Sequence, residues 1–152
     1  MLPNLLNALH VLFAALWVGG MAFALLALRP ALAALEPPQR LALMAGVHKR
    51  FFLLVWHAMP ITLLSGYGLL FGVYGGFRGT GWHVHLMHLT GLVMAGVFLF
   101  IALVPWRAMR AALAAGDAPA AAAANGRIRT LVALNLALGL LTVGVAAWGK
   151  MG

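Results

Sequence analysis

The chain has 152 residues, of which 64% are hydrophobic and 8% charged, and its mean hydropathy is +1.01. Soluble domains carry about 25% charged residues, so this composition excludes an ordinary soluble protein and indicates a chain whose solvent is lipid. A net charge of +8 would suit nucleic acid, but the charges are distributed as a membrane-topology signal, and no nucleic-acid partner is expected. The sequence has no cysteine, which excludes disulfides and thiolate metal sites.

Four long stretches contain no Asp, Glu, Lys or Arg: 2–28, 51–77, 79–106 and 130–149. Each reaches or exceeds the roughly 20 residues that a helix needs to cross about 30 Å of hydrocarbon. Backbone groups in lipid must be hydrogen-bonded within the protein, and no stretch alternates as barrel strands do, so we expect helices. The sequence predicts an all-α integral membrane fold, an up-down-up-down bundle of four transmembrane helices. Its single domain, 1–152, has expected spans at about 4–28, 51–74, 82–106 and 130–149.

The first span lacks the basic n-region of a secretory signal peptide, so we expect a permanent helix that ends near Arg29. It contains His10, Trp17 and Met21. Trp17 lies on the helical face of His10, where it would border a ring-shaped cofactor. Met21 lies near the same face but about 16 Å deeper, which assigns it to a path and not to the same site.

The first loop is interrupted by Pro37 and Pro38. Residues 39–47 predict a short interfacial helix that runs into the second span. His48 stands in the basic segment His48-Lys49-Arg50, and we interpret it as a contact to lipid headgroups.

The second span carries Pro60, which removes a helix hydrogen bond and predicts a kink. His57 lies about two turns from the inner face, at the depth of Asn135 in the fourth span. Either the two hydrogen-bond across helices as structural polar residues, or His57 belongs to an inner metal relay or ligates haem.

The third span begins near Trp82 and places three histidines in its first two turns. His85 and His88 are three residues apart and share a helical face. His83 points elsewhere, and we interpret it as an interfacial residue.

The third loop predicts a short cytoplasmic helix that Asp117 caps and that Asn125 and Gly126 end. The fourth span comes next, at 130–149. Several small residues are suited to close helix contact. They are Gly19, Gly20, Gly91, Ala95 and Gly139.

The basic residues are distributed unevenly between the two sides of the predicted bundle. Eight of the ten lysines and arginines fall in the first and third loops, whereas Arg78 and Lys150 fall on the other side. Basic loops face the cytoplasm, so we expect a multi-pass protein of the bacterial inner membrane with both termini in the periplasm.

Three histidines form the strongest constellation, because spans one and three both run from the outer side inward. His10 therefore lies at a similar depth to His85 and His88, on a different helix. Two opposed histidines suit six-coordinate haem, whereas two on one helix plus a third from another suit a small copper site. Thioethers would assist copper(I), and these come from Met21, Met87 and Met94. Alternatively, the histidines only pack and the methionines fill the core.

Only two residues are acidic, Glu36 and Asp117, and both fall in the expected cytoplasmic loops. The chain therefore lacks a catalytic carboxylate in the membrane, and it has no Ser-His-Asp arrangement or phosphate-binding glycine loop. The sequence disfavours hydrolysis and favours transport, electron transfer or metal-assisted oxidation.

Four segments together resemble the small bacterial proteins of the copper-resistance protein D (CopD) family. They read LHVLFAALWVGGMAF with LRPAL, HKRFFLLVWHAMPITLLSGYGLL, VHLMHLTGLVMAGVF, and RIRTLVALNLALGLLTV. The resemblance implies a four-helix membrane unit associated with copper uptake or resistance. The shared motifs cover His10, Trp17, His85, Met87 and Asn135, which the resemblance marks as functional or structural positions.

A weaker resemblance is to the HemJ-type protoporphyrinogen oxidases and to transmembrane b-type cytochromes, which are haem-associated. It rests on a first-span histidine facing a polar residue of the third span. The HemJ-like pattern has a lysine about where His85 stands, and histidine at that place keeps the capacity to ligate haem.

Three hypotheses result, and enzymatic activity is left open. In the first, a copper-handling protein binds the metal through His10, His85 and His88 near the periplasmic face, with a periplasmic metallochaperone as partner. In the second, the same residues hold haem b for electron transfer, with a quinone as partner. In the third, the chain is a non-catalytic assembly subunit. A bundle of 152 residues has little room for an enclosed pathway, which favours a homodimer in the lipid bilayer.

Overall fold

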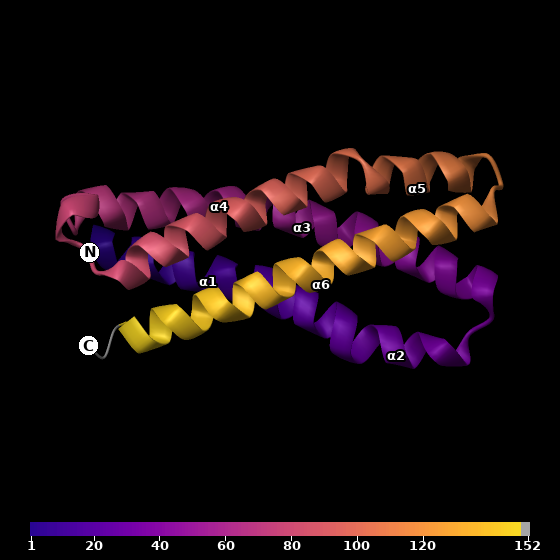
Figure 1. The fold of residues 1–152 in the computed structure, drawn as a ribbon, viewed down its shortest axis with the longest axis horizontal. Coiled ribbons are helices and arrows are strands. Elements are labelled where there is room, and N and C mark those ends of the chain that lie inside the picture. The colour runs from indigo at the N-terminus through magenta and orange to yellow at the C-terminus, as the bar shows by residue number, and fades with distance from the viewer. Residues whose placement is uncertain (150–152) are drawn as a thin grey trace.

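The computed structural model describes residues 1–149, and this part of the chain is helical without any strand. Its helices lie along one long axis (Figure 1). The predicted all-α class and the four membrane-length helices are confirmed. The four apolar segments are Leu2–Ala34, Pro37–Gly72, Trp82–Ala114 and Ala118–Gly149.

The first segment stays helical past Arg29, where the sequence predicted its end. The Arg29 N–H donates to the Ala24 carbonyl five residues back, which is the hydrogen bond of a π turn. Pro30 is tolerated because it stands in the first turn of the next helical piece, where its missing N–H costs nothing. The segment consists of α1 (Leu2–Phe23), the π turn η1 (Ala24–Leu28), α2 (Arg29–Ala31) and the 3-10 turn η2 (Leu32–Ala34).

Helix α3 (Pro37–Gly72) is one continuous helix, so the expected interfacial helix 39–47 is its first part. A capping box starts it, because the Glu36 side chain accepts the Gln39 N–H while the Gln39 side chain accepts the Glu36 N–H. The chain reverses after α3 at Gly75 and Gly76, whose φ angles of +73° and +96° favour glycine.

The short turn η3 (Phe77–Gly79) leads into α4 (Trp82–Leu103), and α5 (Pro105–Ala114) begins after a break at Val104. Val104 has φ −113° and ψ −81°, outside the helical region. The break arises because the Pro105 ring disfavours helical geometry in the residue before it.

Helix α6 (Ala118–Gly149) begins at Asp117, whose carboxylate accepts the Ala120 N–H at 2.9 Å, so the predicted cap is confirmed. The prediction that this helix ends at Asn125 and Gly126 is wrong, since α6 continues through both. One face is buried at three- and four-residue spacing across that point, and packing on this face outweighs the local glycine signal. Its buried residues are Ala121, Ala124, Ile128 and Val132.

Helix α1 packs mainly on α3, whereas α4 and α5 pack mainly on α6. Close approach depends on two glycines: a Cβ on Gly20 would lie 2.5 Å from the Phe51 ring, and one on Gly139 would lie 2.8 Å from Val18. Gly19 and Gly91 have open space beside them, so they do not serve the close contact expected of them.

The helix connections gather at two ends of the molecule (Figure 1). We call the end with Met1, the α3–α4 connection and Gly149 the outer end, and the end with the α2–α3 and α5–α6 connections the inner end. The sides of the membrane that these ends face stay a prediction from the basic residues.

Candidate metal-binding site at the outer end

His10 on α1 is held by the backbone of α3. Its Nδ1 lies 2.8 Å from the Thr62 carbonyl oxygen. A carbonyl only accepts hydrogen bonds, so Nδ1 carries the hydrogen and the lone pair of neutral imidazole is on Nε2. Gly66 makes room for the ring, because a Cβ there would lie 2.9 Å from the His10 Cε1.

This hydrogen bond is the kind that orients a metal-ligating histidine. Such ligands donate their second ring N–H to a carbonyl or carboxylate, which fixes the tautomer and makes the free nitrogen more basic. His10 is half-buried and therefore partly shielded from solvent. The residue fits copper or haem iron as a ligand through Nε2.

His85 and His88 on α4 contact the same aromatic ring, which confirms their predicted common face. His85 stacks on Phe77 with ring centroids 5.4 Å apart. His88 meets Phe77 edge-on at 5.0 Å and Tyr67 at 5.5 Å. Sequence reasoning did not include Phe77 or Tyr67, because only the tertiary fold brings the α3–α4 connection against α4.

His83 points away from this aromatic cluster, toward the end of α6. Its side chain occupies the space that a Cβ on Gly149 would need. The expectation that it faces differently from His85 and His88 is confirmed.

The structure does not gather His10, His85 and His88 into one cluster. Within the described residues 1–149, no group of three or more His, Cys, Asp or Glu side chains is placed to hold a metal ion. Helix α1 packs mainly on α3 and α4 mainly on α6. His10 and His88 contact adjacent residues of α3, His10 at Gly66 and His88 at Tyr67, without joining one cluster.

The methionines predicted as accessory ligands differ in depth. Met21 and Met94 are buried in the core, with 1% and 3% of their surface exposed, and Met87 is half-buried. Met59 on α3 is a further buried thioether that sequence reasoning missed. Met59 adjoins Pro60 and follows His57 by two residues, and this spacing does not mark it as a metal ligand.

Trp17 and Asn135 are both buried and serve packing. Trp17 meets Phe98 edge-on at 6.5 Å. The Asn135 side-chain NH₂ donates to the Met94 carbonyl at 3.2 Å and so joins α6 to α4. Asn135 thus hydrogen-bonds across helices, but to α4 and not to His57.

His57 and His48 differ from their predicted surroundings. His57 is exposed and its Nδ1 donates to the Leu53 carbonyl of its own helix at 2.8 Å, so the expected bond to Asn135 is not formed. His48 is buried, whereas the sequence predicted an exposed residue, since its ring stacks on Phe52 at 5.3 Å and meets Trp106 edge-on. The sequence misled here because His48 adjoins Lys49 and Arg50 yet faces inward.

These features define a multi-pass helical membrane protein with imidazoles at its outer end and thioethers in its core. Residues 45–149 match the family described as Copper resistance protein D. The chain therefore belongs to the copper resistance protein D (CopD) family, which makes it a membrane protein associated with copper. No curated protein and no solved structure matches the chain. His10, Trp17 and Met21 lie before the matched range.

Proposed function

We propose that this protein handles copper in the bacterial inner membrane and receives copper(I) as cargo at its outer end, on the periplasmic side. The observation that supports this most directly is the His10 imidazole, whose Nδ1–H is bonded to the Thr62 carbonyl while Nε2 keeps its lone pair. The CopD membership supports copper as the metal.

The donors become more buried from the outer end toward the core. His85 is exposed, His88 and His10 are half-buried, and Met21 and Met94 are buried. Copper(I) is a soft ion that accepts imidazole and thioether ligands. Helices α1 and α4 pack on different neighbours, so we treat His10 and the pair His85–His88 as two separate binding positions. We propose that the ion occupies these two positions in succession and then passes to the thioethers. A periplasmic metallochaperone is the proposed donor.

Haem b is the second candidate, because a tautomer fixed through Nδ1 suits haem iron as well as copper. In that case His10 with His85 or His88 would hold the haem, which would supply electron transfer with a quinone as partner.

The two candidates differ in their spectra and metal content. Detergent-purified protein should be colourless, and copper(I) titration against a chromophoric competitor should show tight binding. His10→Ala should weaken the affinity by more than about 10- to 100-fold, the loss that follows when only the partner orienting a ligand is removed. His57→Ala is the matched control and should leave affinity unchanged, because His57 is exposed and bonded within its own helix.

Three results would contradict the copper proposal. One is a Soret band with split bands on reduction, which would assign haem. Another is equal copper binding by His10→Ala and the wild type. The last is protein that binds neither copper nor haem on reconstitution, which would assign an assembly role.

A further inference from the structure

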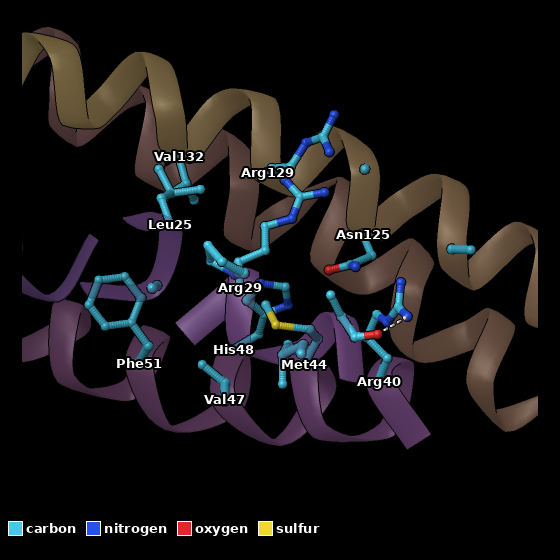
Figure 2. Close-up of a pocket in the computed structure, with 16 residues that line it drawn as sticks. Leu25, Arg29, Arg40, Met44, Val47, His48, Phe51, Asn125, Arg129 and Val132 are labelled. Carbon is cyan, nitrogen blue, oxygen red and sulfur yellow. Dashed lines mark hydrogen bonds between the residues drawn. The ribbon is translucent and has the colours of Figure 1, made fainter. Parts of the chain in front are cut away.

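A cavity of about 580 Å³ lies at the inner end, remote from the outer-end histidines. It is bordered by the π turn and α2 on one side, α3 on another and the first half of α6 on the third (Figure 2). Its polar wall includes three arginines from these three elements. They are Arg29, Arg40 and Arg129.

The positive charge of this wall is not balanced by the chain itself. The only two acidic residues are Glu36 and Asp117. Both accept backbone N–H groups at helix starts, Glu36 from Gln39 and Asp117 from Ala120. Arg40 donates to the Ala33 and Leu35 carbonyls at 3.3 Å and 2.9 Å, which positions its guanidinium without neutralising it.

His48 supplies a second, independent sign of a ligand. Its side chain lines the cavity and only 7% of its surface is exposed, yet its Nδ1 has no hydrogen-bond partner within the described residues. A buried ring nitrogen without a partner is costly. The ring is stacked on Phe52, and a turn of the ring toward the cavity would let a ligand oxygen satisfy this nitrogen.

The cavity changes from cationic to apolar along the bundle axis. Figure 2 shows Arg40 and Asn125 toward one side of the cavity and Leu25, Phe51 and Val132 toward the other. Leu25, Phe51 and Val132 each lie nearer the outer end than the arginine of the same segment, about one turn away in the case of Leu25 and Arg29. The three arginines therefore lie toward the inner end of the bundle and these three apolar residues toward its middle.

The π turn at Ala24–Leu28 directly precedes Arg29. A π turn holds one residue more than an α turn and so rotates the downstream part of the helix by about 100°. The rotated part of the helix begins at Arg29, so the π turn changes the direction in which Arg29 points toward the cavity.

From this gradient, the unbalanced arginines and the unpartnered His48, we propose that the cavity binds one anionic phospholipid of the leaflet at the inner end. Its phosphate oxygens would accept hydrogen bonds from Arg29, Arg129 and His48, and an acyl chain would lie along Leu25, Phe51 and Val132. Arginine suits the phosphate because its planar guanidinium binds two oxygens at once. The site does not depend on copper binding.

The test uses native mass spectrometry of delipidated full-length protein titrated with phosphatidylglycerol. The double variant Arg29→Gln/Arg129→Gln should lower the affinity of the first bound lipid about tenfold or more, since each basic group contributes substantially to anionic-lipid binding. The matched control Arg107→Gln/Arg127→Gln removes the same charge from the same end but from residues outside the cavity. It should bind within about twofold of wild type.

Three outcomes would overturn the assignment. Equal losses in both double variants would show general surface electrostatics. Equal affinity for phosphatidylcholine would show that the anionic headgroup is not selected. Displacement of the lipid by millimolar inorganic phosphate would assign the cavity to a free anion. Thermal unfolding of each variant ensures that only folded protein is compared.

Discussion

At the scale of single residues, His10 shows how a helix backbone selects a ligand tautomer. The Thr62 carbonyl accepts from His10 Nδ1 at 2.8 Å. This carbonyl lies four residues before Gly66, the position over which the imidazole is placed. A residue with no side chain is required there because the ring approaches the backbone itself.

We therefore predict that Gly66→Ala weakens copper(I) binding although it touches no metal. The added methyl would lie 2.9 Å from Cε1 and 3.1 Å from Nδ1 of His10, so the ring must leave the Thr62 carbonyl. The expected loss in affinity, measured by competitive titration, is about tenfold, as for other residues that orient a ligand.

Gly96→Ala is the control for this change, because a Cβ there meets nothing within 4 Å. Both substitutions raise helix propensity by about 1 kcal/mol, so stability alone does not separate them. Unchanged copper affinity in Gly66→Ala would refute the role of the His10 orientation.

Two polar side chains of α6 donate hydrogen bonds to α4 in the core. Thr142 on α6 donates to the Thr90 hydroxyl on α4 at 2.6 Å, and Asn135 donates to the Met94 carbonyl. Hydrogen bonds of this kind between membrane helices contribute about 0.6 kcal/mol on average. They fix the register of α4 against α6 more than they stabilise the bundle.

At the scale of elements, α6 is the helix on which the others converge, since it contacts α1, α3, α4 and α5. Gly139 is the point where this helix meets two neighbours at once. A Cβ there would lie 2.8 Å from Val18 of α1 and 3.2 Å from Met94 of α4. Small residues at such crossings allow van der Waals contact, which replaces the hydrophobic effect as the force between helices in lipid.

We predict that Gly139→Leu destabilises the bundle. A leucine cannot fit without separating α6 from α1 and α4, and overpacking of this kind costs about 1–3 kcal/mol. The thermal midpoint of detergent-solubilised protein, followed by circular dichroism, should fall accordingly.

Gly144→Leu provides the comparison on the same helix, because a Cβ at Gly144 meets nothing within 4 Å. Its midpoint should stay near that of the wild type. A drop of equal size in both variants would show that α6 is sensitive to bulk in general and not to the crossing at Gly139.

At the scale of the whole molecule, the inner end carries the first and third connections, next to which eight of the ten basic residues lie. Basic segments resist translocation, so the inner end is expected in the cytoplasm. A periplasm-active alkaline phosphatase fused after Gly152 should be active, whereas the same enzyme fused after Gly116 in the α5–α6 turn should be inactive. The reverse pattern in whole-cell assays would invert the topology.

Much of the fold was predictable because it depends on local properties. Hydropathy and length alone gave four membrane helices, and helix periodicity gave the common face of His85 and His88. The continuation of α6 through Asn125 and Gly126 was not predictable, because the buried face that extends across these residues packs on neighbouring helices.

The candidate site was predictable only in part. Depth along each span can be read from residue number, so the outer position of His10 and of the α4 histidines could be inferred from the sequence. The depth of a residue along its span does not show which helices are neighbours. The sequence therefore could not show that His10 and His88 contact adjacent residues of α3, Gly66 and Tyr67.

The sequence by itself determined that this protein is a four-helix membrane protein with imidazoles at one end and basic residues at the other, because composition and spacing are properties of each segment alone. The tertiary structure decided which surfaces meet. It placed His10 on the Thr62 carbonyl, buried His48 among Phe52 and Trp106, and brought three arginines from three segments around one cavity. These contacts depend on helix pairing, which rests on shape complementarity between faces distant in the chain.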